Sequence, residues 1–283
     1  MKKHSIEAIP LIKDFCDWLH EQKKSPNTIK TYRRELEKYH EWLQGRGTGI
    51  NLLKKVDIQS YIDYLEDQQK SITTIDKTVG VIRTFAKYLG KPELTFGLDL
   101  QPVEKNNHIE TLSAMEYSQL LKEVKEDGNP RNIAIVYVLL HTGIRVSELC
   151  HLDRSHIDFE NHELTVEKGE DTRVIPLSKD VREYLQTYLD SHPHEAVFVS
   201  SQTGERLTER AVQYMVKKYK VTPQKLRHTF CQRLIDNGVD VETVARLAGH
   251  KDVNVTKRYV KAQMNNQKVQ DAINHAFNND MIG

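Results

Sequence analysis

The chain has 283 residues, of which 38% are hydrophobic and 29% are charged, and its formal net charge is +1. This length suffices for one large domain or two modest ones, and the composition is that of an ordinary globular protein. The longest strongly apolar run, IAIVYVLL, is far shorter than the about 20 residues that a membrane-spanning helix needs. Charged residues interrupt the first segment, MKKHSIEAIPLIKDF, too early for a secretory signal. We therefore expect no membrane association.

Three cysteines, Cys16, Cys150 and Cys231, lie far apart and form no CxxC motif. Their odd number and spacing indicate a reducing compartment, here the cytoplasm, and predict no metal cluster. All three have apolar neighbours, so we interpret them as small core residues; a catalytic cysteine is the alternative.

The charge is unevenly distributed along the chain. Residues 1–92 hold 17 Lys and Arg against 12 Asp and Glu, whereas residues 111–283 hold 23 against 24. A mildly basic first segment is compatible with phosphate contacts but does not require them, because solvated helix faces have the same composition.

The first 92 residues contain four segments with apolar residues at helical spacing: IPLIKDFCDWLHEQK, SPNTIKTYRRELEKYHEWLQGRG, VDIQSYIDYLEDQQ and SITTIDKTVGVIRTFAKYLG. Short connections between them predict a compact helical module. Its third and fourth helices carry Lys and Arg beside Thr, Tyr and Gln, which are suitable contacts for phosphates and base edges. Residues 93–110 have no helical period and form the predicted interdomain linker.

The second part of the chain, 111–283, begins with two predicted helices, SAMEYSQLLKEVKED and NPRNIAIVYVLLHTG, followed by a short one in RVSELCHL. Two strands, Glu163–Glu167 and Arg173–Leu177, are predicted on either side of the turn KGED. Further helices are expected around 180–190, 208–219, 224–236 and 240–248. The predicted fold is mainly α, with a four-helix domain followed by a mostly helical domain that contains a small antiparallel sheet.

Several polar residues stand at the ends of these predicted elements. Arg145 follows a helix end, where its side chain could bind a phosphate or pair with Glu148. Lys168 lies at the hairpin tip, a usual place for a solvated residue. His250 follows Gly249, where it could also complement a helix dipole. Taken alone, Arg227 and Tyr259 are equally compatible with structural roles.

Four motifs in this order and spacing change that balance: HTGIRVSEL, KGEDTRVIPL, QKLRHTF and LAGHKDVNVTKRYV. Together with the segment SPNTIKTYRREL and the linker before TLSAMEY, they resemble the tyrosine recombinase (phage integrase) family over nearly the whole chain. The size and layout are similar to Xer-type recombinases, and also to TnpI-type resolvases of replicative transposons. The resemblance implies a SAM-like fold for 1–92, a tyrosine recombinase catalytic domain for 111–283, and no cofactor or metal.

The resemblance also implies a role for each matching residue. Tyr259 would be the nucleophile, and Arg145 and Arg227 would clamp the scissile phosphate. Lys168 would protonate the leaving 5′ oxygen, and His250 would bind the phosphate or receive the tyrosine proton. The residue types fit this chemistry, because two guanidinium groups stabilise the charge of an attacked phosphodiester and a phenol with a pKa near 10 needs activation.

Gln224 departs from the family pattern, which commonly has His three residues before the second arginine. Residues three apart on a helix are neighbours, so we expect Gln224 and Arg227 to face the same phosphate. An amide donates a hydrogen bond but carries no proton or charge. The loss of a charge-assisted bond costs roughly 1–2 kcal/mol, about tenfold in rate. The adjacent His228 matches the family motif and is expected to brace the site.

The predicted function is site-specific recombination of double-stranded DNA through a 3′-phosphotyrosyl intermediate and a Holliday junction, in integration, transposition or replicon resolution. The resemblance implies a tetramer on two sites, coupled by a tail helix in KAQMNNQKVQDAINHAFNN. Two alternatives stay open. One is a type IB topoisomerase-like nicking and closing activity, and the other is a DNA-binding accessory protein that has lost strand exchange.

Overall fold

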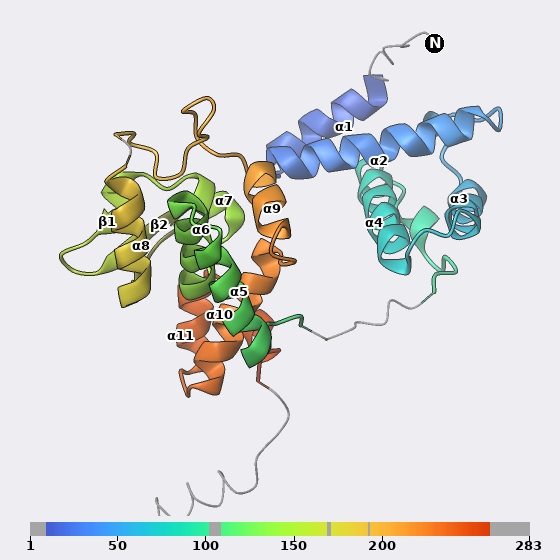
Figure 1. The fold of residues 1–283 in the computed structure, drawn as a ribbon. Coiled ribbons are helices and arrows are strands. Elements are labelled where there is room, and N and C mark those ends of the chain that lie inside the picture. The colour runs from blue at the N-terminus through green and yellow to red at the C-terminus, as the bar shows by residue number, and fades with distance from the viewer. Residues whose placement is uncertain (1–9, 102–108, 169–170, 192, 261–283) are drawn as a thin grey trace, which may run out of the picture. The chain divides into compact units, whose positions relative to one another are not determined.

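A computed structural model of the chain describes residues 10–101, 109–168, 171–191 and 193–260. The chain divides into two compact units, Met1–Asn106 and Asn107–Gly283, each with its own hydrophobic core (Figure 1). In the described part, no helix is both long and apolar enough to cross a membrane.

The N-terminal unit is built from four helices: α1 (Pro10–Glu21), α2 (Pro26–Gln44), α3 (Lys55–Asp67) and α4 (Ile72–Tyr88). Short 3-10 turns follow α2 at Ile50–Leu52 and α4 at Pro92–Thr95. Serines begin two of the helices, because the hydroxyls of Ser25 and Ser71 accept hydrogen bonds from backbone N–H groups of the first turn.

The predicted apolar faces form the core of this unit. Leu36, Tyr39 and Leu43 of α2 are buried, as their helical spacing predicts. Phe15 of α1 meets Phe85 of α4 edge-to-face, with ring centroids 5.1 Å apart. The four predicted helices of the first 92 residues are all present.

The second unit is organised around a buried helix, α6 (Pro130–Thr142), which packs against α8 (Lys179–Leu189) and α10 (Pro223–Asp236) (Figure 1). α6 is apolar on nearly every side because neighbouring elements surround it. It ends at Gly143, whose φ of 62° lies in the left-handed region. A Cβ atom at this position would lie 2.2 Å from the Phe230 ring, so only glycine fits.

The small sheet has three antiparallel strands in the order β1 (Ile157–Asp158), β2 (Glu163–Lys168) and β3 (Asp171–Pro176). The two longer strands confirm the predicted hairpin, although β3 begins two residues earlier than predicted and ends at Pro176. β1 was not predicted, because a two-residue strand has no alternation to detect.

The remaining helices of this unit are α5 (Ala114–Glu126), α7 (Val146–Cys150), α9 (Glu209–Lys217), α11 (Val241–Ala248) and α12 (Asn254–Lys257). All but α12 were predicted, and a 3-10 turn at Arg154–His156 precedes the sheet. The predicted tail helix over 261–279 lies outside the described residues. The predicted fold class, mainly helical with a small antiparallel sheet, is confirmed.

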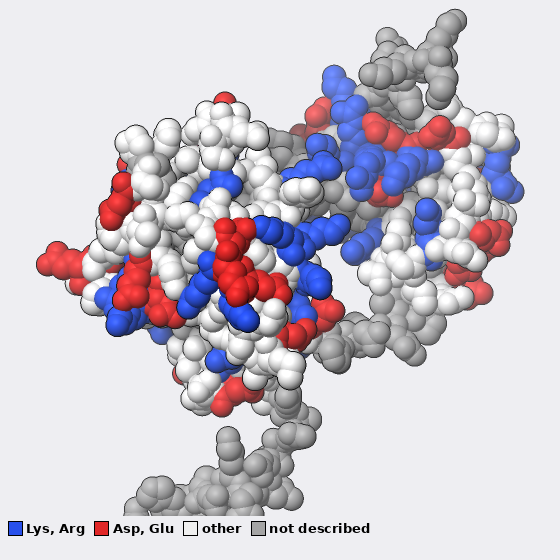
Figure 2. Space-filling model, viewed as in Figure 1, with Lys and Arg blue, Asp and Glu red and all other residues white. Residues whose placement is uncertain are grey.

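Basic and acidic side chains are interspersed over the surface of each unit in the view of Figure 2. This mixture agrees with the net charge of +1. Net charge therefore says little about what either unit binds, and the argument for function depends on individual side chains.

Candidate active site

The first two turns of α10 place three polar side chains close together. Thr222 caps the helix, since its hydroxyl accepts a hydrogen bond from the Lys225 N–H at 3.0 Å, and Pro223 takes the first helical position. Gln224, Arg227 and His228 follow on these turns. Leu226 is buried between them and anchors this end of the helix in the core.

Arg227 is 4% exposed, which is rare for a guanidinium group. Its Nη1 donates a hydrogen bond to the carbonyl oxygen of Gly143 at 2.5 Å. Burial, together with the nearby positive charge of Arg145, lowers the pKa of Arg227 to about 10. The side chain is therefore still charged at neutral pH.

Arg145 occupies the N-cap position of α7, and its side chain makes two contacts. Its Nη1 lies 2.9 Å from Oε1 of Glu148, and its Nη2 donates to the carbonyl oxygen of Gly249 at 2.6 Å. The ion pair with Glu148, considered as an alternative from the sequence, is thus present. It leaves open a phosphate-binding role, because a guanidinium has five N–H donors.

Glu148 is a buried carboxylate that holds two arginines, and the second one was not predicted from the sequence. Arg173 of β3 donates to Glu148 Oε2 at 2.7 Å and to the Leu247 carbonyl at 2.9 Å. Burial alone would raise the pKa of Glu148, but hydrogen bonds from Arg173 and the Arg145 backbone, with their charges, lower it to about 2. Glu148 is therefore ionised and fixes both guanidinium groups.

Two hollows meet at Arg145. One, of about 580 Å³, is bordered by Arg145, Gln224, Arg227 and Lys217. The other, of about 560 Å³, is bordered by Arg145, Arg173 and His250. The predicted clamp residues Arg145 and Arg227 thus line the same hollow, and three cationic side chains there favour an anion.

His250 follows Gly249, the left-handed residue that ends α11 (φ 66°). Its Nδ1 lies 2.7 Å from the Thr256 hydroxyl oxygen. Burial, and then the charges of Arg227 and Arg145, lower the pKa of His250 to about 4. The ring is therefore neutral at physiological pH.

Tyr259 lies just after α12, and only 1% of it is exposed. Its ring packs in a small cluster with Phe230, Cys231, Val244 and Ala248. Burial, and secondarily the neighbouring Cys231, raises the pKa of Tyr259 above its ordinary value. The phenol is therefore protonated in the free protein, and its oxygen is shielded from solvent.

The hydroxyl group of Tyr259 is hydrogen-bonded to Nδ1 of His228, and not to His250. The opposite ring nitrogen of His228, Nε2, lies 2.9 Å from Nε2 of Gln224. Gln224 does border the hollow beside Arg227, but its amide is engaged with His228. From the sequence we expect His228 only to brace the site. Its contact with Gln224 could have been found from the spacing, because residues four apart lie one helical turn from each other.

Lys168 ends β2, where its backbone pairs with Asp171 at the start of β3. The hairpin predicted around it is present. The Lys168 side chain and residues 169–170 lie outside the described part of the chain, so its catalytic role stays a prediction.

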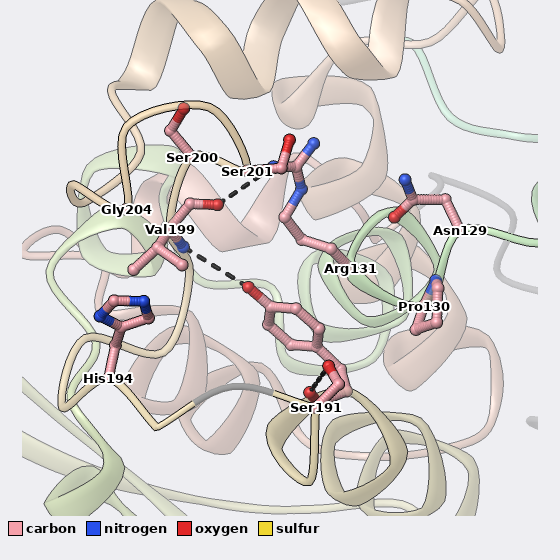
Figure 3. A pocket seen from close by; sticks show the side chains of 10 residues that line it. Asn129, Pro130, Arg131, Ser191, His194, Val199, Ser200, Ser201 and Gly204 are labelled. Carbon is pink, nitrogen blue, oxygen red and sulfur yellow. Dashed lines mark hydrogen bonds between the residues drawn. The ribbon is translucent and has the colours of Figure 1, made fainter.

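Two further features belong to the same unit. Among the residues that the structure describes, no group of three His, Cys, Asp or Glu side chains could hold a metal ion. A separate hollow of about 330 Å³ lies at the start of α6 (Figure 3). There Arg131 Nη1 donates to the Val199 carbonyl at 3.1 Å, and the Val199 N–H points to the Tyr188 hydroxyl. None of the predicted catalytic residues lines this hollow.

This fold is that of the tyrosine recombinases, and two arginines border one hollow while a histidine of α10 contacts a buried tyrosine. The chain belongs to the phage integrase family: the model of that family matches residues 110–276, and the model of its N-terminal SAM-like domain matches residues 12–91. The prediction of the family is confirmed, and the protein is a site-specific DNA recombinase.

Curated relatives span nearly the same length. Tyrosine recombinase XerC of Staphylococcus aureus (strain USA300 / TCH1516) is 29% identical over 271 residues, covering 88% of this chain and 90% of its own. XerC of Lacticaseibacillus casei (strain BL23) is 29% identical, covering 86% and 91%.

Solved structures share the fold. The Tn1549 transposon integrase in complex with a circular intermediate DNA has a TM-score of 0.76 at 19% identity, covering 93% of this chain and 98% of that one. XerH bound to its difH substrate has a TM-score of 0.68 at 17% identity, covering 93% and 83%.

Proposed function

We propose that Tyr259 attacks a phosphodiester of double-stranded DNA and forms a 3′-phosphotyrosyl bond, while the 5′ oxygen leaves as a hydroxyl. The observation that carries this proposal is that Arg145 and Arg227 border one hollow. Gln224 borders that hollow too and is linked through His228 to the Tyr259 hydroxyl. The covalent bond keeps the energy of the broken phosphodiester, so the strand is rejoined to a new partner without ATP.

The two arginines would stabilise the attacked phosphate. As the tyrosine oxygen approaches phosphorus, negative charge grows on the non-bridging oxygens. Guanidinium forks fixed beside them stabilise that charge strongly, because they are already oriented and partly shielded from water. Both guanidinium groups are held in place, since Arg145 bonds to Glu148 and Arg227 bonds to Gly143.

The remaining roles are those that the family resemblance assigns. Lys168, at the end of β2, would give a proton to the leaving 5′ oxygen, since an alkoxide is a poor leaving group. His250 borders the second hollow beside Arg145 and would donate a hydrogen bond to the phosphate as a neutral ring. We assign it that role, because its Nδ1 is already paired with Thr256.

Burial of Tyr259 implies that cleavage needs a local rearrangement. At 1% exposure the phenol cannot reach a phosphate that enters the hollow from solvent. We propose that DNA binding moves the segment around α12, so that the hydroxyl approaches the arginines. A DNA-dependent step of this kind would keep the free protein from cutting at random.

The assembly proposed is a tetramer on two recombination sites, acting in the cytoplasm. Each pair of strands would be exchanged in turn through a Holliday junction. The N-terminal unit would hold the duplex together with the second unit, and residues 261–279 would dock on a neighbouring subunit. Related structures, which contain integrase or recombinase bound to DNA, support the DNA-binding part of this proposal, and the tetramer and the docking of residues 261–279 rest on the family resemblance.

Covalent trapping tests the proposal. The DNA flanking the gene would be screened for a protected and cleaved site, and that site would be nicked next to the scissile bond so that the cut strand diffuses away. The native protein is expected to form a protein–DNA adduct, and Tyr259→Phe is expected to form none while it still binds.

The products of the same reaction separate the alternatives. Recombinant molecules that require two sites indicate a recombinase, whereas relaxation of a supercoiled plasmid with one site indicates topoisomerase-like activity. Binding without any adduct on the true site would indicate an accessory protein and would refute the proposal.

A further inference from the structure

We propose that His228 accepts the phenolic proton of Tyr259 during cleavage and that Gln224 is the positioning residue that holds the His228 ring. This inference rests on the proposed function, in which His250 binds the phosphate, and it assigns the acceptance of the tyrosine proton to a different residue. Gln224 stands where a histidine is common, and an amide cannot take up a proton.

Contacts at both ring nitrogens carry the inference. Nδ1 of His228 is hydrogen-bonded to the Tyr259 hydroxyl, and Nε2 lies 2.9 Å from the Gln224 amide. Gln224 and His228 are one turn apart on α10, so the same helix aligns both side chains. A proton acceptor must be within hydrogen-bond reach of the proton that it takes, and His228 is the histidine in that position.

The Gln224 amide determines which nitrogen carries the proton. In the arrangement seen, its N–H₂ group faces Nε2 and donates to it, so Nδ1 carries the hydrogen and donates to the phenol oxygen. A half-turn of the amide places Oε1 against Nε2–H instead. The lone pair of Nδ1 then faces the phenol O–H, which is the arrangement that a base requires.

The protonation states on either side fit a transfer that accompanies attack. Burial, with the charge of Arg227, lowers the pKa of His228, so the ring is neutral and one of its two nitrogens carries a lone pair. The raised pKa of Tyr259 keeps the phenol protonated until its oxygen begins to bond to phosphorus. The proton therefore stays on the phenol at rest.

The Tyr259 oxygen forms a bond to phosphorus, its O–H bond breaks, and the proton moves to Nδ1 of His228. The bond from phosphorus to the 5′ oxygen breaks, and that oxygen takes a proton from Lys168. In rejoining, the 5′ oxygen bonds to phosphorus and its proton returns to Lys168, while the bond from phosphorus to the Tyr259 oxygen breaks and His228 returns its proton to the departing phenol oxygen. The imidazolium formed in between donates Nε2–H to the Gln224 carbonyl.

The role of His228 is tested by single-turnover cleavage of the nicked recombination site used for covalent trapping. We expect His228→Ala and His228→Asn to lose about 10²-fold or more in cleavage rate while binding DNA normally, which is the usual contribution of a positioned base. The Asn variant keeps a hydrogen-bond acceptor near the Nδ1 position, so it separates proton transfer from packing. Added imidazole is expected to restore part of the lost rate in His228→Ala.

A matched control is available on α6. His141 is also a half-buried histidine bonded at both ring nitrogens, to the Tyr117 hydroxyl and to Ser178, each at 2.9 Å. His141→Ala should cleave at close to the native rate and should not respond to imidazole. Gln224→Met, which keeps the length of the side chain but not its hydrogen bonds, should slow cleavage without changing DNA binding.

A substrate with sulfur in place of the bridging 5′ oxygen distinguishes base from acid. A thiolate leaves without protonation, so this DNA should restore cleavage by Lys168→Ala but not by His228→Ala. If His228→Asn cleaves at the native rate while Tyr259→Phe forms no adduct, the inference fails and the proposed function stands. If Tyr259→Phe still forms the adduct, the proposed function itself is wrong.

Discussion

Glu148→Gln removes the charge of the buried carboxylate that holds Arg145 and Arg173. The pKa of Glu148 is lowered to about 2 in the folded protein, against an ordinary value of 4.5. This gap corresponds to about 3 kcal/mol of folding stability. Because the folded-state pKa lies below the unfolded one, the contribution is fully present above pH 4.5 and is lost as the pH falls toward 2.

The native protein and Glu148→Gln would therefore be compared by denaturant unfolding at several pH values. Hydrogen exchange of the α6 amides would report the unfolding of the second unit. The free energy of unfolding of the variant should be about 3 kcal/mol lower at pH 7, and the deficit should shrink to about 1 kcal/mol at pH 3. The amide does not titrate, so only the native protein loses this contribution.

Two controls accompany the Glu148→Gln experiment. Glu126→Gln, on α5, alters an exposed carboxylate 3.8 Å from Lys122 and should change stability by less than about 1 kcal/mol. Both tryptophans, Trp18 and Trp42, lie in the N-terminal unit, so their emission reports on that unit and should be unaffected. A deficit for Glu148→Gln that stays constant between pH 7 and pH 3 would refute the reasoning.

Four shorter predictions concern other residues of the second unit. Gly249→Ala places a Cβ atom 2.8 Å from the Arg173 guanidinium at φ 66°, so we expect a loss of roughly 1–3 kcal/mol in denaturant unfolding. Arg145→Lys should lower single-turnover cleavage about 10²–10³-fold with DNA affinity nearly unchanged; an unchanged rate would remove it from the site. Lys168→Ala should slow cleavage about 10²-fold. Ser113→Ala removes the α5 capping box and should cost about 1 kcal/mol of stability with no change in cleavage.

The secondary structure could be predicted well wherever a helical pattern of apolar residues extends over several turns. The helices of the first unit and α6 have apolar residues repeated over several turns, and start signals such as Ser25-Pro26 mark where helices begin. Two short elements, β1 and α12, escaped prediction because two and four residues carry too little periodicity. Their conformation depends on partners that come from elsewhere in the chain.

The candidate site could be predicted as a set of residues but not as a set of contacts. The four motifs pointed to Arg145, Arg227, His250 and Tyr259, and the structure brings the two arginines to one hollow. The motifs could not show that the tyrosine hydroxyl meets His228 and not His250. That choice depends on where the residues just after α12 meet α10, a tertiary contact with no local signature.

The role of Arg173 could not be predicted from the sequence either. Its sequence position, in the middle of a strand, is that of an ordinary half-buried residue. Its importance comes from Glu148, which lies 25 residues earlier and which both Arg145 and Arg173 contact. A charge network of this kind can be recognised only when the chain has been folded.

The two arginines proposed to clamp the phosphate differ from most surface arginines because hydrogen bonds to the protein backbone hold their side chains. A free Arg side chain loses up to about 2 kcal/mol of conformational entropy when it is fixed in place. Here folding has already immobilised both, through the carbonyl oxygens of Gly143 and Gly249, the residues that end α6 and α11. A phosphate entering the hollow would order these side chains very little. Their attraction for it would therefore appear in calorimetry as favourable enthalpy with only a small entropic opposition, and helix termination would contribute directly to the strength of DNA capture.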